Sequence, residues 1–185
     1  MTIFEYLMVF VSIILGLGMT QALRGLSKIA RSDTPYSAVT LWAALLVYLH
    51  VQVWWALWDL HVIESWNQGY FTFIVLIPCS MFAATELLVP MGTTADTDWR
   101  SHYFKVRRWF YAAMIVFTFL ATVETYVLLS VPLTHPYRIM QVVMLTLLAV
   151  GFASPNPRVQ PWIPGLAIVN LAAGQVIFRL LPGLL

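Results

Sequence analysis

The residues of this sequence with the clearest capacity for chemistry are ionisable side chains inside long apolar stretches. They are four acids and one histidine: Glu5, Asp59, Glu86, Glu124 and His50. On insertion scales a charged group at the centre of a bilayer costs about 2.5–3.5 kcal/mol, so such residues are generally paired, hydrated or functional. Carboxylates and histidines in these surroundings are typical of proton and cation pathways.

From these residues we predict an outward-opening polar vestibule that holds protons or cations on their way through the protein. Its expected lining is Glu5, His50, Glu124 and either Asp59 or Arg179, with Glu124 or His50 as the titrating group. On an unbroken helix His50 and Asp59 are about 180° apart, so these two cannot point at one site. Arg179 is a natural counter-ion for one of the acids, because pairing removes most of the cost of an isolated buried charge. The competing interpretation is that each acid serves only in a structural ion pair.

Two of the apolar stretches carry polar residues on more than one face. In the second stretch, one helical stripe contains His50 and another contains Gln52 and Asp59. The last stretch repeats this pattern with Asn170 and Gln175. A helix that is polar on two sides within an apolar setting is expected to be surrounded by protein.

The elements that must position these residues are apolar helices. Of the 185 residues, 61% are hydrophobic and 10% are charged, and the mean hydropathy is +0.81. Five of the six stretches have the roughly 20 residues that a helix needs to cross the hydrocarbon core of a bilayer, whereas the fifth has only 15 and is expected to be broken or shielded by neighbours. We therefore predict an all-α fold in a single transmembrane domain, residues 1–185, built as an integral membrane bundle of six transmembrane helices. The predicted spans are 3–23, 39–60, 70–89, 109–131, 139–153 and 162–181.

The basic residues predict the orientation, because cytoplasmic connections carry an excess of Lys and Arg. If the chain begins outside, Arg138 and Arg179 fall on the outer side and the other basic residues fall on the inner side. Both termini are therefore expected to be extracytoplasmic. Near the inner end of the third stretch, Glu86 lies at the depth of Arg24, and these two are expected to form a polar pair. The inner-side basic residues are Arg24, Lys28, Arg31, Arg100, Lys105, Arg107, Arg108 and Arg158.

The longest connection, residues 90–108, has a pattern of its own. Trp99, Tyr103, Val106 and Phe110 recur at helical spacing, which predicts a short interfacial helix before the fourth span. Its cationic surroundings would suit docking of anionic lipids or a partner protein. The alternative is an anchor that only fixes orientation. The docking residues would be Arg100, Lys105, Arg107 and Arg108.

Several classes of function are not expected from this sequence. The single cysteine, Cys79, allows neither an intramolecular disulfide nor a CxxC motif. We expect no metal site and no cofactor, because HExxH, paired metal-ligand spacings and glycine-rich nucleotide fingerprints are missing. We expect no enzymatic activity. Nucleic acid is not an expected partner, because the net charge is only +2 and the basic residues follow the topology.

Two groups of segments carry a resemblance to known proteins. They are FEY at 4–6 followed by SIILGLG at 12–18, and HYF at 102–104 followed by RRWF at 107–110. In these segments the chain resembles a group of small, uncharacterised, multi-pass bacterial inner-membrane proteins of about this length. The resemblance implies a bacterial cytoplasmic (inner) membrane and several spans, and it carries over no activity, ligand or catalytic residue.

These features together predict a small channel or transporter for protons or small cations. It would be surrounded by membrane lipids and would act as a homo-oligomer or with partner membrane subunits, since a 21.0 kDa bundle has little interior of its own. The alternative is a non-catalytic accessory or scaffold subunit of a larger membrane complex. Polar stripes that point into a cavity would favour transport, whereas stripes that point at a dry partner surface would favour the subunit.

Overall fold

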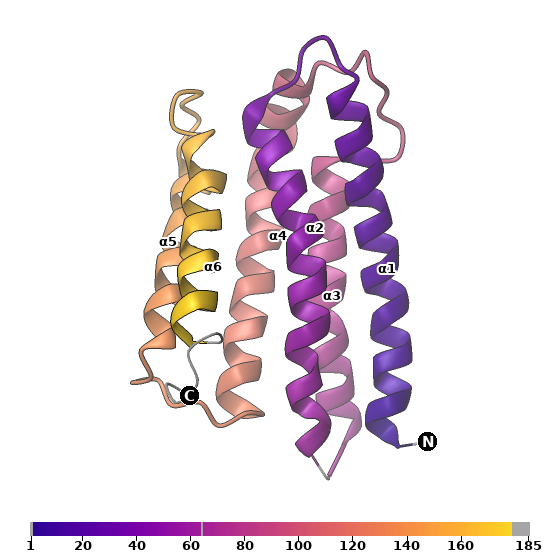
Figure 1. Ribbon diagram of the computed structural model, residues 1–185, viewed down its shortest axis with the longest axis vertical. Helices are drawn as coiled ribbons and strands as arrows, with labels where there is room; N and C mark the ends of the chain where they lie inside the picture. The colour runs from indigo at the N-terminus through magenta and orange to yellow at the C-terminus, as the bar shows by residue number, and fades with distance from the viewer. Residues whose placement is uncertain (1, 64, 179–185) are drawn as a thin grey trace.

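The computed structural model describes residues 2–63 and 65–178, and this part of the chain is all-helical (Figure 1). The helices alternate in direction, so α1 begins at the same end of the bundle at which α6 ends. We call this the N-terminal end and the other the opposite end. The elements are α1 (Ile3–Ala30), α2 (Ser37–Ala56), the 3₁₀ helix η1 (Leu57–Val62), α3 (Gln68–Leu88), α4 (Trp99–Val127), α5 (Tyr137–Ala153) and α6 (Trp162–Phe178).

Four of these helical segments are long and apolar enough to cross a membrane: α1, α2 continued by η1, α3 and α4. By length and composition they indicate a membrane protein. The helices α5 and α6 are also apolar but have 17 residues each. At the helical rise they are about 25 Å long, somewhat less than the roughly 30 Å hydrocarbon core.

Side-chain caps explain where several helices begin. Thr2 and Glu5 form a capping box at the start of α1, in which each side chain accepts a hydrogen bond from the other residue's backbone N–H. Asn67 caps α3 with a single bond, in which its side-chain oxygen accepts from the Tyr70 N–H. The Asp98 carboxylate accepts from the Ser101 N–H at 3.0 Å and so starts α4.

The predicted separate interfacial helix before the fourth span is not what the structure contains. Residues 90–98 form a connection, and α4 runs without a break from Trp99 to Val127. The helical spacing was real, since Trp99, Tyr103 and Phe110 are all buried on one face of α4. No glycine or proline interrupts this stretch, so the helix continues directly into the apolar segment.

The helices form a four-helix bundle with a helical hairpin beside it (Figure 1). Within the bundle, α3 packs mainly on α4 and α1 packs on α2 and α3. The hairpin of α5 and α6 joins the bundle mainly through the packing of α5 against α4 and of α6 against α2. Between the hairpin and the bundle there is a space that side chains fill only in part.

A close approach between α1 and α2 occurs at Gly18, where the His50 ring lies directly over the glycine. A Cβ atom at position 18 would overlap the imidazole. His50 is 1% exposed, and its Nδ1 lies 2.7 Å from the carbonyl oxygen of Leu46, one turn earlier in α2. Small residues permit such close packing of membrane helices.

Replacing Gly18 by alanine is therefore expected to destabilise the α1–α2 contact by about 1–3 kcal/mol, the usual cost of overpacking a well-filled core. The matched control is Gly16→Ala, because a Cβ at position 16 has no neighbour within 4 Å. That variant should be as stable as the wild type or more stable by up to about 1 kcal/mol, since alanine is the better helix former. Unfolding in mixed detergent micelles, followed by circular dichroism, measures both. Equal stability of the two variants would show that His50 moves aside without cost.

Candidate functional site

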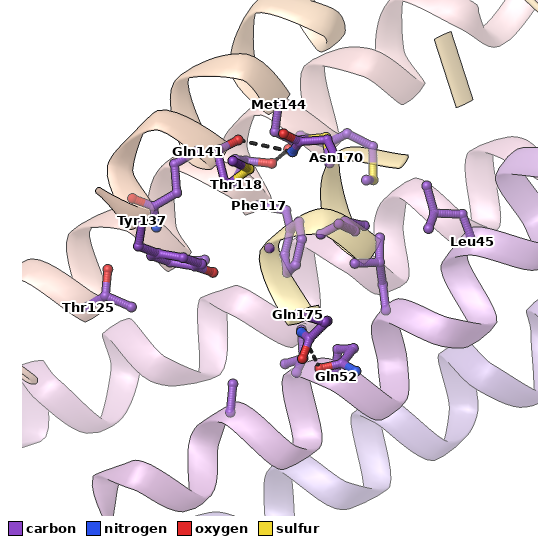
Figure 2. A pocket seen from close by; sticks show the side chains of 18 of the residues that line it. Leu45, Gln52, Phe117, Thr118, Thr125, Tyr137, Gln141, Met144, Asn170 and Gln175 are labelled. Carbon is purple, nitrogen blue, oxygen red and sulfur yellow. Dashed lines mark hydrogen bonds between the residues drawn. The ribbon is translucent and has the colours of Figure 1, made fainter. Parts of the chain in front are cut away.

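A cavity of about 170 Å³ lies between the α5–α6 hairpin and helices α2 and α4 (Figure 2). It is partly open to the surroundings. Four helices contribute to its walls, and two of them, α2 and α6, are far apart in the sequence. We call this space the hairpin cavity.

Most of the polar lining residues lie toward the N-terminal end of the bundle, because they are close to the ends of α2, α4 and α6 and to the start of α5. We call this part of the hairpin cavity its shallow end and the part farther from the N-terminal end its deep part. The deep part is lined mainly by apolar side chains, together with the polar side chains of Thr118 and Asn170. The apolar residues include Trp42, Leu45, Met114, Phe117 and Met144. The polar residues at the shallow end are Gln52, Glu124, Thr125, Tyr137, Gln141 and Gln175.

Hydrogen bonds hold several of these polar groups in place. The Gln175 Nε2 donates to the Gln52 Oε1 at 3.0 Å and so links α6 to α2 across the cavity (Figure 2). In the deeper part, the Asn170 Nδ2 donates to the Met140 carbonyl oxygen at 3.1 Å, which joins α6 to α5. The cavity is thus bridged from wall to wall by amide side chains.

Glu124 is the one acidic side chain in the lining of the hairpin cavity, within the part of the chain that the structure describes. Its residue is 6% exposed. It lies within the last turn of α4, next to Thr125, whose hydroxyl accepts a hydrogen bond from the Arg138 Nη1 at 2.7 Å. A buried carboxylate at the polar end of a membrane cavity can hold a proton or a cation.

Arg138 supports this end of the cavity without lining it. The guanidinium is 7% exposed and donates to carbonyl oxygens of Val131, Pro132 and Thr122, so it closes the turn between α4 and α5. It also donates to the Gln141 Oε1 at 2.7 Å. These bonds fix Gln141 and Thr125 in the cavity wall.

The structure does not bring the predicted pathway residues into one vestibule. Glu5 is exposed in the capping box of α1 and borders a shallow groove formed with Trp54 and Trp58. His50 faces α1 at Gly18 and is absent from the hairpin cavity. Asp59 is exposed on η1, and Arg179 lies outside the described residues. Of the predicted pathway residues that the structure describes, Glu124 is the one that lines the hairpin cavity.

The predicted pathway residues lie apart because of the way the helices pack against one another, which the sequence alone does not give. Around α2, His50 and Gln52 differ by about 200° in direction. One therefore faces α1 and the other faces α6, as the His50–Gly18 and Gln52–Gln175 contacts show. The helix therefore has polar residues on two faces, but the expectation that protein surrounds it is wrong, because Trp54 and Trp55 are 48% and 60% exposed.

The predicted inner-side pair of Glu86 and Arg24 is wrong, because the structure describes no ion pair between them. The Glu86 Oε1 instead accepts a hydrogen bond from the Met91 N–H at 3.3 Å, just beyond the end of α3. Gln21 and Lys28 on α1 donate to the carbonyl oxygens of Val89 and Met91. Arg24, one turn before Lys28, is exposed.

Of the four predicted docking residues, Arg107 has a different role. It is 6% exposed, and its Nη1 donates to the carbonyl oxygens of Gly151, Phe152 and Ser154 at the end of α5. The prediction treated it as a surface cation, but it lies on the buried face of α4. The other three residues are exposed, and their docking function stays a prediction: Arg100, Lys105 and Arg108.

Arg107 belongs to a buried network that the sequence analysis missed, which we call the inner polar cluster: Tyr103, Arg107, Tyr111 and Gln160. The hydroxyls of Tyr103 and Tyr111 donate to the Gln160 Oε1 at 2.6 and 2.9 Å. The Gln160 Nε2 donates to the Gly151 carbonyl oxygen at 3.0 Å. The sequence feature that could have indicated this cluster is the spacing of Tyr103, Arg107 and Tyr111, which lie four residues apart and therefore on one helical face.

The packing around this cluster requires a glycine in α5. The Tyr111 ring lies against Gly151 so closely that a Cβ at that position would overlap the ring. On the bundle side, the Trp42 indole N–H donates to the Tyr111 hydroxyl at 3.3 Å. Since Trp42 also lines the deep part of the hairpin cavity, the cluster fixes the hairpin beside that part of the cavity.

No model of a known protein family, no curated protein and no solved structure matches this chain. Among residues 2–63 and 65–178, no group of three or more His, Cys, Asp or Glu side chains is arranged to hold a metal ion. A functional assignment for this chain therefore depends on the hairpin cavity and its carboxylate.

Proposed function

We propose that this chain is a small bacterial inner-membrane channel or transporter for protons or small cations, with six membrane spans and both termini extracytoplasmic. The observation that carries the proposal is Glu124, a 6% exposed carboxylate in a cavity between apolar helices. The protein is expected to act as a homo-oligomer in the bilayer.

The arrangement of charges supports this topology. The connections at the opposite end of the bundle are the α1–α2 turn, the α3–α4 connection and the α5–α6 turn (Figure 1). Arg31, Arg100 and Arg158 lie in or next to these three connections. Positive charge concentrated at one end favours a cytoplasmic location for that end. The short α5 and α6 would then cross with local thinning of the bilayer or with shielding by neighbouring chains.

The direction of the polar stripes favours transport over the competing accessory or scaffold role. Gln52 on α2 and Gln175 on α6 meet at the cavity that contains Glu124. The polar face of His50, by contrast, packs against α1 and has no place in the pathway. The proposed pathway therefore starts at the N-terminal end of the bundle and reaches Glu124, without Glu5 or His50.

Reconstitution tests the proposal. The protein is purified in a mild detergent, its mass and co-purifying chains are measured, and it is placed in liposomes that contain a dye sensitive to H⁺, Na⁺ or K⁺, matched to the gradient imposed. An imposed pH, Na⁺ or K⁺ gradient should dissipate faster than in protein-free liposomes. Dissipation at the protein-free rate under every gradient, together with stable foreign chains in the preparation, would instead support the accessory subunit.

A further inference from the structure

We propose that the deep part of the hairpin cavity binds an uncharged aromatic alcohol with one ring, of the phenol class. The ring lies among the apolar side chains, and its hydroxyl group donates to the side-chain oxygens of Asn170 and Thr118. This inference goes beyond the proposed cation pathway, because the ligand carries no charge and lies deeper in the protein than Glu124.

The size of the cavity limits the ligand to about one ring. The cavity has a volume of about 170 Å³. An apolar cavity of roughly 150 Å³ inside a protein accommodates benzene, so a benzene ring with one further heavy atom fits this space. Most drug-sized ligands occupy pockets of about 300–1,000 Å³ and are too large for it.

The apolar side chains of the deep part suit an aromatic ring. Trp42 and Phe117 offer ring faces and edges, and contacts between aromatic rings contribute energy beyond the area that they bury. Met114 and Met144 offer thioethers, which are flexible and make favourable contacts with aromatic rings. The lining of the deep part therefore favours an aromatic body over an aliphatic one.

Two polar side chains of the deep part have oxygens that can accept a hydrogen bond. Asn170 is 9% exposed, and its Nδ2 donates to the Met140 carbonyl oxygen, whereas its Oδ1 accepts no hydrogen bond from the residues that the structure describes. The Thr118 hydroxyl donates its hydrogen to the Met114 carbonyl oxygen at 2.9 Å, which leaves its oxygen as an acceptor. Figure 2 shows Asn170 and Thr118 in the same region of the cavity, near Met144. The polar group of the ligand must therefore be a hydrogen-bond donor.

The ligand is uncharged because the deep part has no charged side chain among the described residues that line it. An unpaired charge is costly to bury in apolar surroundings. Glu124 lies at the shallow end and already has an interaction of its own. At the same end, the oxygens of Thr125 and Gln141 accept hydrogen bonds from the Arg138 guanidinium. A neutral hydroxyl group is thus the donor that fits the oxygens of the deep part.

The composition of the lining favours an organic ligand over water alone. A buried water molecule generally has two to four polar partners, and apolar cavities stay empty. In the deep part, polar side chains come from two residues and the others are apolar. A pocket lined mainly by hydrophobic and aromatic side chains, with a few polar groups that orient the ligand, is the usual form of a small-molecule site.

Equilibrium dialysis of phenol against the detergent-purified full chain tests this proposal, with toluene as a probe of similar shape that lacks the hydroxyl group. Protein-free micelles of the same detergent are dialysed in parallel, so that partition of the probes into detergent is subtracted. Saturable binding of phenol is expected. Uptake no greater than that of the micelles, as expected if water or a lipid chain fills the cavity, would overturn the proposal.

Two variants test the hydrogen bond to the hydroxyl group, and the measured quantity is the ratio of phenol affinity to toluene affinity. Asn170→Leu should lower this ratio about three- to tenfold, which corresponds to the loss of one neutral hydrogen bond. Thr118→Val, which keeps the volume of the side chain, should lower it in the same direction and stays informative if the Asn170 variant fails to fold.

The matched control is Thr122→Val. The Thr122 hydroxyl donates to the Thr118 carbonyl oxygen at 2.8 Å, one turn further along α4, and Thr122 does not line the cavity. The affinity ratio of this variant should equal that of the wild type. An unchanged ratio in every folded lining variant, or an equal fall in the control, would contradict the assignment.

Gly174→Leu tests the position of the ring. Position 174 lines the cavity one turn beyond Asn170, and a Cβ there meets only the Met140 side chain, at 3.7 Å. A leucine at this position should occupy the space and abolish saturable binding of both phenol and toluene. Wild-type binding of both probes by a folded Gly174→Leu protein would place them outside the hairpin cavity and overturn the proposal.

Discussion

Replacing Glu124 by glutamine is expected to reduce proton or cation flux in proteoliposomes to the rate of protein-free liposomes. Glutamine keeps the shape and hydrogen-bonding capacity of the side chain but removes the charge and the titratable proton. Because Glu124 is the one acidic residue among the described cavity lining residues, no neighbouring group in that lining can take over its role. The flux assay under the same imposed gradient measures the effect.

The control for this prediction is Glu86→Gln. Glu86 accepts a hydrogen bond from the Met91 N–H at the opposite end of the bundle, and a glutamine oxygen can accept the same bond. The flux through the Glu86→Gln variant should equal that through the wild type. Helical content and elution profile must be unchanged in both variants. Unchanged flux in a folded Glu124→Gln protein would remove this carboxylate from the mechanism.

The positions of the helices were predictable because apolar residues concentrate where a helix is expected to cross the bilayer. The structure has a helix at each of the six predicted stretches. The helix ends were less predictable, because the length of an apolar stretch corresponds to the thickness of the hydrocarbon core, whereas the helix itself can continue beyond that stretch. Thus α1 was predicted to end at residue 23 but continues through its polar last turns to Ala30, and α4 begins at its Asp98 cap.

The end of the second helix shows another limit. Its predicted span ran to residue 60, but α2 ends at Ala56 and the chain continues as the 3₁₀ helix η1. A 3₁₀ helix has three residues per turn, so the α-helical angles used for Asp59 do not apply there. The side chain of Asp59 is exposed, and its separation from His50 arises from this change in helix type as well as from sequence spacing.

The candidate site could be predicted one helix at a time but not as a whole. The sequence identified Glu124, Gln52 and Gln175 as polar residues in apolar segments, and the structure places all three in one cavity. It could not show that α6 packs on α2, which brings residues 52 and 175 within hydrogen-bonding distance. Long-range helix pairing of this kind depends on side-chain fit across the whole bundle. Periodicity within one segment carries no information about it.

Replacing Arg107 by methionine is expected to destabilise the protein by roughly 2–4 kcal/mol, because hydrogen bonds to charged groups contribute about 1.5–3 kcal/mol each and are not additive at one site. The Arg107 Nη1 bonds to the Phe152 and Ser154 carbonyl oxygens are 2.9 and 2.7 Å long. They satisfy the free carbonyls at the end of α5, where the helix dipole also favours a cation. Methionine fills the space but leaves the Phe152 carbonyl without this donor. Unfolding in mixed micelles measures the loss.

The matched control is the neighbouring residue on the same helix, Arg108→Met. The Arg108 guanidinium is exposed and lies 5.0 Å from the centroid of the Phe152 ring, an arrangement that contributes about 0.5–1 kcal/mol at an exposed site. The expected difference between the two variants therefore isolates the buried bonds from the loss of one positive charge. Because the Gln160 Nε2 also donates to the Gly151 and Ser154 carbonyl oxygens, the hairpin should loosen and not detach. Equal stability of the two variants would show that the end of α5 is held by Gln160 and the tyrosines, and that the burial of Arg107 contributes little.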